Sequence, residues 1–168
     1  MNTQMIKPFF LTIVLYLFFI TPSSAQDTMP VKWQHGMKLL LTYSGGMSPY
    51  YLKAEITDTG SYITETIKNK LTRYKVEIPN DQLDELMHYL HQHQFHKLKA
   101  KMTGPVSDKG SESILITWNG GSAGAGENYM MGYEGKDSEL YSMLRHHIYS
   151  LIVAHRTKKQ PLQLTETL

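Results

Sequence analysis

The sequence predicts an α+β fold in which an antiparallel sheet of about six strands carries two helices on one face, in the order β-β-β-β-α-β-β-α. Three observations lead to this fold class. An amphipathic helical segment spans Asn80 to Leu98, four strand-like segments precede it, and two more strand-like segments and a second helical segment follow it. Neither helix can bury its apolar stripe alone, so both need the sheet as a partner.

Residues 1–25 have the composition of a secretory signal peptide. Lys7 precedes an apolar run from Phe9 to Ile20, and the small residues Ser23 and Ala25 stand at the cleavage positions. The alternative is an uncleaved anchor, although this run is shorter than the roughly 20 apolar residues that span a bilayer. We therefore expect a periplasmic or secreted bacterial protein with no stable membrane anchor after cleavage.

Composition narrows the function classes. The chain has 168 residues and a formal net charge of +2, and residues 1–25 hold one lysine and no acidic residue. A balance this close to neutral gives no electrostatic reason to expect a nucleic acid as a partner. The absence of cysteine excludes disulfides, thiol catalysis and cysteine-ligated zinc, so packing must stabilise the fold.

The mature chain is long enough for a single domain with one core. Residues 26–36 are mostly polar and have no hydrophobic period, which predicts a mobile lead-in. We expect the domain to occupy residues 37–155. Residues 156–168 also lack a period, which predicts a loose C-terminal tail.

Four strand segments fill the first half of the domain and predict a meander. Apolar and polar residues alternate along most of their length, which places one side of each strand against a core. The four segments are Met37–Tyr43, Tyr50–Thr57, Ser61–Lys68 and Thr72–Ile78. Gly45, Gly46 and Pro49 end the first strand, and Asp58-Thr59-Gly60 forms a hairpin turn.

The helix after the meander is the clearest element of the sequence. Its apolar residues recur at the spacing that forms one stripe on a helix, namely Leu83, Leu86, Met87 and Leu90. Asn80 is placed to cap the first turn, where Asp81 favours the positive end of the helix dipole. Polar residues then interrupt the stripe, so we expect the regular helix to end near Gln94, with Phe95 and Leu98 packing from the exit turn.

The second half of the domain is predicted to hold a hairpin and a second helix. Lys99 to Glu112 is a long connection, and connections of this length are often functional. We expect strands at Ser113–Trp118 and Glu127–Tyr133, joined by a glycine-rich turn at Asn119–Gly126. The last helix is expected from about Ser138 to His155.

Several of these features together resemble a known group of proteins. They are Gly45-Gly46 before Pro49-Tyr50-Tyr51, the hairpin through Asp58-Thr59-Gly60, and Gln82-Leu83-x-x-Leu86 with Phe95 and Leu98 closing the helix. Over about Met37 to Leu98, this arrangement is similar to small exported bacterial domains of unknown function. The resemblance implies the fold and an address outside the cytoplasm, and it supplies no catalytic residues.

The helical segments are rich in histidine, which is a common zinc ligand. These histidines are His88, His91, His93, His96, His146, His147 and His155. His88 and His91 point to a different side of the helix from His93 and His96, so the four cannot share one ion. A site of His88, His91 and a carboxylate is an alternative, but we expect a polar helix surface without a metal or other cofactor. His147 interrupts the apolar stripe of the last helix, and we expect it to be a hydrogen-bonded core residue.

Three carboxylates flank the second hairpin, namely Asp108, Glu112 and Glu127. Converging carboxylates can serve acid–base catalysis or bind calcium. The chain has no G-x-S-x-G elbow, no HExxH motif and no phosphate-binding loop. We therefore assign no catalytic residue, and we keep a hydrolase or metal-dependent enzyme that uses these carboxylates with a histidine as the alternative function.

Tyrosines suggest a surface for binding. Five of them, Tyr50, Tyr51, Tyr62, Tyr129 and Tyr133, are candidates for an aromatic surface on the sheet face that the helices leave uncovered. Cross-strand packing of these rings within the sheet is the interpretation that we favour.

The leading hypothesis is a non-catalytic exported binding or accessory domain whose partner is an unknown protein, peptide or glycan. Its contact surface would be the uncovered sheet face with the loop from Gly45 to Tyr51. The candidate ligand-binding residues are Tyr50, Tyr51, Asp108, Glu112 and Glu127. A subunit of a larger assembly is the third hypothesis.

Overall fold

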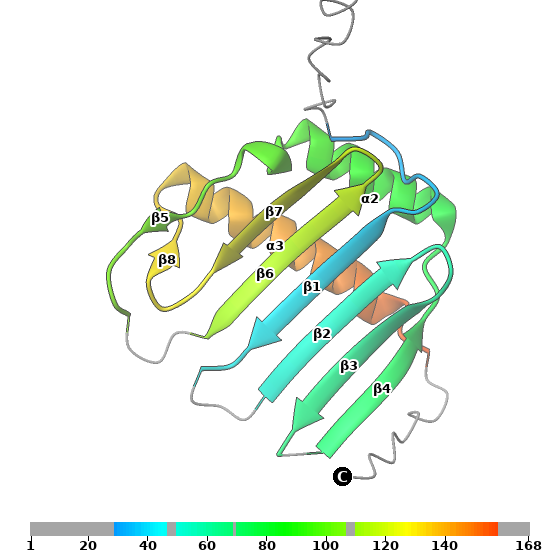
Figure 1. Cartoon of the computed structure of the whole chain (residues 1–168), viewed down its shortest axis with the longest axis horizontal. Helices are drawn as coiled ribbons and strands as arrows, with labels where there is room; N and C mark the ends of the chain where they lie inside the picture. Colours follow the sequence, from blue (N-terminus) through cyan, green and yellow to red (C-terminus); the bar gives the residue numbers. More distant parts are fainter. Residues whose placement is uncertain (1–28, 47–49, 69, 107–109, 158–168) are drawn as a thin grey trace, which may run out of the picture.

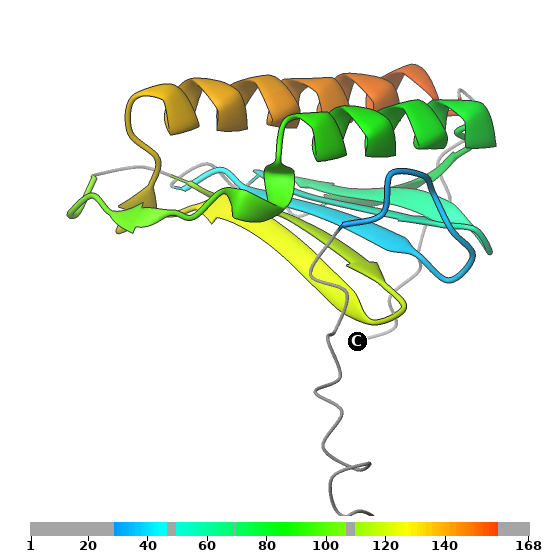
Figure 2. The ribbon, with the colours of Figure 1, turned by 90° about the horizontal axis from the view of Figure 1, so that it is seen from above.

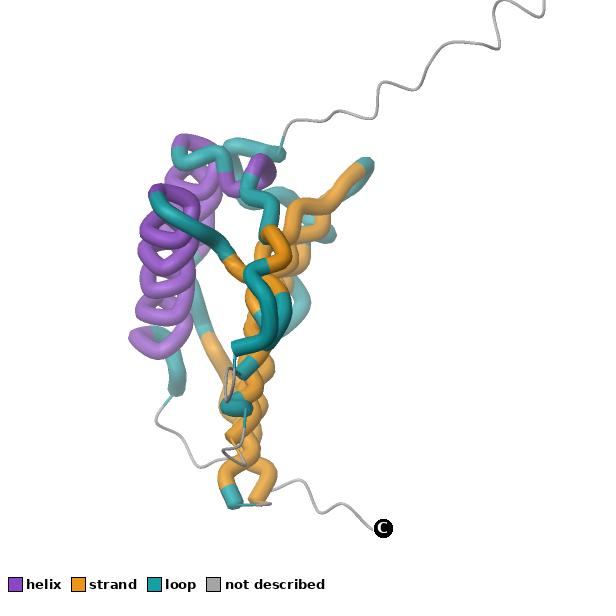
Figure 3. Tube along the Cα trace, turned by 90° about the vertical axis from the view of Figure 1, so that its left-hand side faces the viewer, coloured by secondary structure: helices purple, strands orange, loops and turns teal. Residues whose placement is uncertain are grey.

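The computed structural model describes residues 29–46, 50–68, 70–106 and 110–157. Within these ranges, a six-stranded antiparallel sheet forms one layer and two helices form a second (Figure 3). Both helices lie on the same face of the sheet (Figure 2). The predicted α+β fold class is therefore confirmed.

The elements follow the predicted order. The meander consists of β1 (Lys38–Ser44), β2 (Tyr50–Thr57), β3 (Ser61–Ile67) and β4 (Lys70–Val76). The rest of the domain consists of helix α2 (Asn80–Gln92), the 3-10 turn η1 (Phe95–Lys97), β6 (Ser111–Trp118), β7 (Gly121–Glu127) and helix α3 (Lys136–Ala154). Two short strands, β5 (Lys101–Met102) and β8 (Met131–Gly132), pair with each other outside the main sheet.

The spatial order of the sheet is β4-β3-β2-β1-β6-β7 (Figure 1). The second hairpin therefore joins the meander through β1. In the register of this sheet, Leu41 of β1 lies opposite Ala54 of β2 and Ile114 of β6. Residues in register share a face, so one layer of apolar side chains runs across the sheet beneath the helices.

Helix α2 packs on this layer through the predicted stripe, because Leu83, Leu86, Met87 and Leu90 are all buried. Phe95 and Leu98 are also buried, as expected for the exit turn. The prediction of a cap at Asn80 is wrong. The helix already begins at Asn80, and the extended residue before it, Pro79, has no side chain that can accept a hydrogen bond.

The prediction for the last strand is also wrong. Asn119 and Gly120 do form a turn, but the rest of the expected turn belongs to strand β7, and most of the expected strand at Glu127–Tyr133 lies beyond β7. The glycines of β7 are needed for close approach to β6. A Cβ on Gly126 would lie 2.6 Å from the carbonyl oxygen of Glu112, and one on Gly121 would lie 2.8 Å from the ring of Trp118.

Histidine 147 is not the core residue that we expected. His147 is exposed and stacks on Tyr89 of α2, with ring centroids 4.3 Å apart. The buried stripe of α3 consists of Tyr141, Leu144, Ile148 and Ile152 and does not include His147. Tyr141 takes a core position that was not foreseen, and this moves His147 to the surface.

The segments at both ends of the domain are more closely packed than expected. Residues 29–36 contain no helix or strand, but Met29 is 1% exposed and the backbone N–H of Trp33 donates to Oδ1 of Asp84 on α2 at 2.9 Å. At the other end, Arg156 forms an isolated antiparallel β-bridge with Val76 of β4. The expected signal peptide, residues 1–25, lies outside the described ranges, as does most of the expected tail.

The sheet is longer than the helix layer. At one end the strands extend past α3 (Figure 3), so that inward-facing residues there have no helix above them. Tyr43 and Ile67 are inward-facing by register, yet both are exposed. We call this part of the sheet the overhang and define it by Tyr43, Tyr50 and Ile67.

The packing of α3 predicts a contrast between two neighbouring residues. Leu144→Ala should lower the free energy of unfolding by about 2–5 kcal/mol, because it leaves a cavity where Leu144 is fully buried. Met143→Ala should change it by less than about 0.5 kcal/mol, since Met143 is 41% exposed. Urea unfolding of both variants measures the difference, and equal losses would show that α3 packs on the sheet with another face.

Candidate functional site

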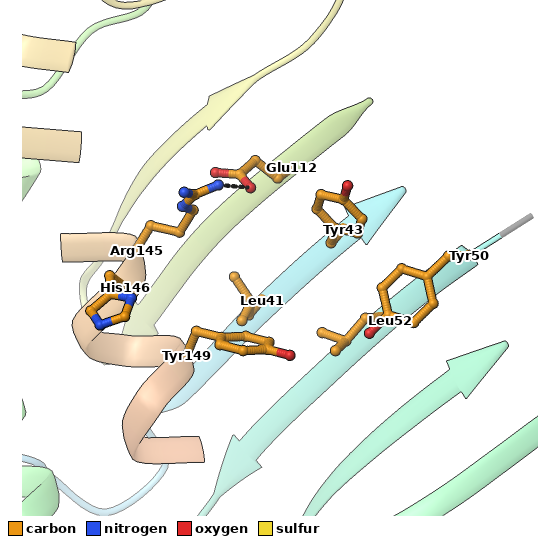
Figure 4. A pocket seen from close by; sticks show the side chains of 8 residues that line it. All are labelled: Leu41, Tyr43, Tyr50, Leu52, Glu112, Arg145, His146 and Tyr149. Carbon is orange, nitrogen blue, oxygen red and sulfur yellow. Dashed lines mark hydrogen bonds and ion pairs between the residues drawn. The ribbon is translucent and has the colours of Figure 1, made fainter. Parts of the chain in front are cut away.

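A cleft with a volume of about 360 Å³ lies between α3 and the overhang. Its lining residues come from β1, β2, β6 and α3 (Figure 4) and are Leu41, Tyr43, Tyr50, Leu52, Glu112, Arg145, His146 and Tyr149. Leu41 and Leu52 form an apolar floor, and three tyrosines stand around it. The cleft is thus mostly apolar, with its charged groups on one side.

The side chains that α3 contributes to the cleft are positioned by the spacing of residues along the helix. Tyr141, Arg145 and Tyr149 follow one another at intervals of four residues, which places them along one side of the helix. Tyr141 is buried, whereas Arg145 and Tyr149 project toward the strands (Figure 4). This stripe runs along the edge of α3 that faces the overhang.

The sheet supplies a matching row of side chains. By register, Glu127, Glu112, Tyr43, Leu52 and Glu65 lie side by side on β7, β6, β1, β2 and β3. All five face the helix layer. The row therefore combines carboxylates with the aromatic and apolar floor of the cleft.

Glu112 and Arg145 form the ionic side of the cleft. Nη1 of Arg145 donates to Oε2 of Glu112 at 3.0 Å, and this bond raises the pKa of the guanidinium. The side chain of Glu112 is 10% exposed and that of Arg145 is 44% exposed. Glu112 is thus a nearly buried charge that depends on its partner, while Arg145 reaches the cleft surface.

Tyr141 lies beside the other oxygen of Glu112. Oε1 of Glu112 and the hydroxyl of Tyr141 are both buried, and neither makes a hydrogen bond of good geometry within the described residues. Burial and then the charge of Glu112 raise the pKa of the Tyr141 hydroxyl. Tyr141 therefore stays neutral and fills the space behind the carboxylate.

A second ion pair lies on the Tyr50 side of the cleft. Nη1 of Arg156 donates to Oε1 of Glu65 at 3.1 Å, and the guanidinium lies 3.2 Å from the ring centroid of Tyr74. Burial, followed by the charge of Glu65, raises the pKa of Tyr50 to about 12. The Tyr50 hydroxyl is therefore protonated at neutral pH and can donate a hydrogen bond.

Of the candidate binding residues from the sequence, some lie at the cleft and others do not. Tyr50 and Glu112 both line the cleft, and Glu127 lies next to Glu112 in register. Tyr51 points to the opposite face of the sheet, because successive residues of a strand alternate. Asp108 lies outside the described ranges.

The candidate aromatic surface is not formed. Tyr50 faces the helices, Tyr133 is buried with its hydroxyl accepting from the backbone N–H of Gly126, and Tyr129 lies beyond β7. Of the five tyrosines, only Tyr51 and Tyr62 are on the uncovered face. They lie near opposite ends of the antiparallel β2–β3 hairpin, since Tyr62 pairs with Glu55 and Tyr51 pairs with Thr66. Because successive side chains of a strand point to opposite faces, the five tyrosine rings do not gather on one face of the sheet.

Several cleft residues were not foreseen from the sequence, namely Leu41, Tyr43, Leu52, Arg145, His146 and Tyr149. One available signal is the spacing of Tyr141, Arg145 and Tyr149, which puts two tyrosines and an arginine on one helix edge. The proximity of β1 to β6 had no such signal, because periodicity does not give strand order.

The histidines are dispersed over both helices. His91 and His96 have ring centroids 6.4 Å apart, and His88 shares a shallow groove with carboxylates of the first turns of α2. Nowhere in the described ranges do three His, Asp or Glu side chains gather in a way that could hold a metal ion. His146 is the histidine that lines the cleft.

No protein-family model matches this chain, and no curated protein sequence is significantly similar to it. None of the helices in the described part of the chain is both long and apolar enough to cross a membrane.

The burial of Glu112 predicts an asymmetry between single and double variants. Arg145→Gln should destabilise the fold by about 2 kcal/mol, because it leaves a nearly buried carboxylate without its charged partner. The double variant with Glu112→Gln should be less destabilised, since both charges are removed. Urea unfolding measures both, and a double variant that loses more stability than Arg145→Gln would contradict this account of the pair.

The raised pKa of Tyr50 predicts a loss of stability in alkali. An unfolded tyrosine loses its proton near its ordinary pKa of 10.0, whereas the folded Tyr50 keeps it up to about pH 12. The contribution of Tyr50 is therefore fully present below pH 10 and is lost as the pH rises toward about 12. In Tyr50→Phe, the free energy of unfolding should fall less steeply over this interval, and an unchanged slope would refute the assignment.

Proposed function

We propose that this protein is an exported, non-catalytic binding domain that holds a small, mostly apolar group in the cleft between α3 and the overhang. Export is supported by the sequence pattern of residues 1–25. Binding is supported by the cleft itself, whose volume falls in the range of small-molecule sites. The group would be a free small molecule, or one ring or side chain of a larger peptide or glycan.

The observation that carries this proposal is the combination of an apolar floor with polar groups around it. Leu41 and Leu52 would contact the apolar part of a ligand. The side chains of Tyr43, Tyr50 and Tyr149 form amphipathic walls, and their hydroxyls can make hydrogen bonds to the polar part of the ligand. An apolar cleft with a few directed polar groups is typical of a ligand site.

An enzyme remains the second candidate. Register brings Glu112 and Glu127 to neighbouring positions, and His146 lines the same cleft. Two carboxylates and a histidine are groups that hydrolases use for proton transfer. Hydrolysis of chromogenic esters or glycosides that disappears in Glu127→Gln would favour this candidate over pure binding.

The uncovered sheet face remains a candidate surface for contact with a protein or for a subunit contact in an assembly. Its side chains are mainly polar or charged, including Lys53, Tyr62 and Arg73. Such a face is suited to a polar, solvated contact. This surface is distinct from the cleft, so the two can be tested separately.

Thermal unfolding with small ring compounds tests the binding proposal. Phenylacetate, 2-phenylethanol and methyl glucoside are suitable probes, because each contains one six-membered ring and they differ in polarity. At ten times its dissociation constant, a probe should add about 1.4 kcal/mol to the free energy of unfolding. The proposal requires that at least one probe raises the unfolding midpoint.

Two variants of α3 locate the effect. Tyr149→Ala removes a wall of the cleft, whereas Val153→Ala changes a residue that is equally exposed, 42% for each, but does not line the cleft. Binding should weaken by about tenfold in the first variant only. If no probe binds, or if both variants bind as the unchanged protein does, the cleft is not the site.

A further inference from the structure

We propose that the cleft selects small carboxylic acids whose apolar part is an aromatic ring or a branched chain. This inference rests on the proposed function, since it names the ligand class of the same cleft. It follows from an inventory of the hydrogen-bonding groups that face the cleft and of the partners they already have.

The first step concerns acceptors. Glu112 is the carboxylate among the residues that line the cleft. Its Oε2 already accepts from Arg145, and its Oε1 is buried beside Tyr141. Since Oε1 is buried, an ammonium group on a ligand would have to share Oε2 with Arg145, so the cleft is less suited to an amine than to an anion.

The second step concerns donors. A guanidinium carries five N–H groups in a plane, and the bond to Glu112 uses Nη1 of Arg145. The side chain of Arg145 remains 44% exposed at the cleft, which leaves other N–H groups within reach of a ligand. The hydroxyls of Tyr43, Tyr50 and Tyr149 add three further donors. The tyrosine hydroxyls can also accept, but the guanidinium can only donate, so a ligand that bonds to Arg145 must supply acceptors.

The third step concerns positioning. The contact with Glu112 holds the guanidinium of Arg145 at one side of the cleft whose floor is Leu41 and Leu52 (Figure 4). A fixed guanidinium loses little side-chain freedom when it binds a second group. A carboxylate gives charge-assisted bonds to such an arginine, which are stronger than the bonds of a neutral hydroxyl.

The fourth step concerns net charge. Arg145 is paired with Glu112 and Arg156 is paired with Glu65, and Glu127 next to Glu112 adds a further carboxylate, so these groups give the cleft no net positive charge. A carboxylate therefore gains from the directed N–H groups of Arg145 rather than from a general positive field. This makes the geometry of Arg145, and not charge alone, the basis of selection.

Three probes with the same ring and different polar groups test this inference on the whole protein, namely phenylacetate, 2-phenylethanol and 2-phenylethylamine. Titration calorimetry should show that phenylacetate binds about tenfold more tightly than 2-phenylethanol, because of its charge-assisted bonds. The amine should bind most weakly. A preference for the alcohol or the amine, or equal affinities, would overturn the ligand class while leaving the cleft as a binding site.

Variants then assign the preference to Arg145. In the double variant Glu112→Gln/Arg145→Gln, which removes both charges together, phenylacetate should lose its advantage over 2-phenylethanol. Arg145→Lys keeps the charge but not the planar donors, and it should lose most of the advantage as well. Arg73→Gln is the matched control, because Arg73 lies on the opposite face of the sheet over the ring of Tyr62.

The outcomes separate this inference from the proposed function. Retention of the preference in both Arg145 variants, with Arg73→Gln unchanged, would show that another group selects the carboxylate and would overturn the role of Arg145. Failure of all three probes to bind the unchanged protein would overturn this inference, and failure of methyl glucoside as well would remove the proposed function with it.

Discussion

The helix layer of this domain is shorter than the sheet that it covers, and the character of the cleft depends on this difference. Beneath α2 and α3, the inward-facing positions of the strands are apolar and buried, as at Leu41 and Ile114. Where the strands pass beyond α3, the same face has no cover, and a purely apolar surface there would be exposed to water. Tyr43 and Tyr50 share this end of the sheet with the exposed Ile67, and Glu112 lies opposite Tyr43 in register, which yields an amphipathic site beside the core.

Glu112 connects the helix layer to this end of the sheet. A carboxylate that is 10% exposed needs a partner, and Arg145 supplies it from α3. Arg156, which follows α3, forms a similar ion pair with Glu65 of β3, which lies two strands away from β1 in the sheet. The two pairs tie α3 and the segment after it to the sheet on both sides of Leu41 and Leu52. The space between these contacts is the cleft, so its shape follows from the same interactions that hold the layers together.

The features that depend on local spacing could be predicted, and those that depend on strand neighbours could not. The stripe of α2 follows from helical periodicity alone, and its residues are buried as expected. The glycine-rich sequence of β7 predicts a turn, because glycine usually breaks strands, whereas here Gly126 is required by the close approach of β6. The cleft joins residues of β1, β2, β6 and α3, and only the spatial order of the sheet brings them together. Tyr50 and Glu112 were identified singly, but their common site was not.

The most direct test of the cleft is nuclear magnetic resonance of leucine methyl groups during titration with phenylacetate. Leu41 and Leu52 form the floor of the cleft, whereas Leu40 and Leu115 are cross-strand neighbours on the uncovered face. The four residues belong to adjacent strands and differ in the face they occupy. We expect the methyl signals of Leu41 and Leu52 to shift with ligand concentration and those of Leu40 and Leu115 to stay unchanged. Shifts confined to Leu40 and Leu115 would contradict the account and place binding on the uncovered face of the sheet.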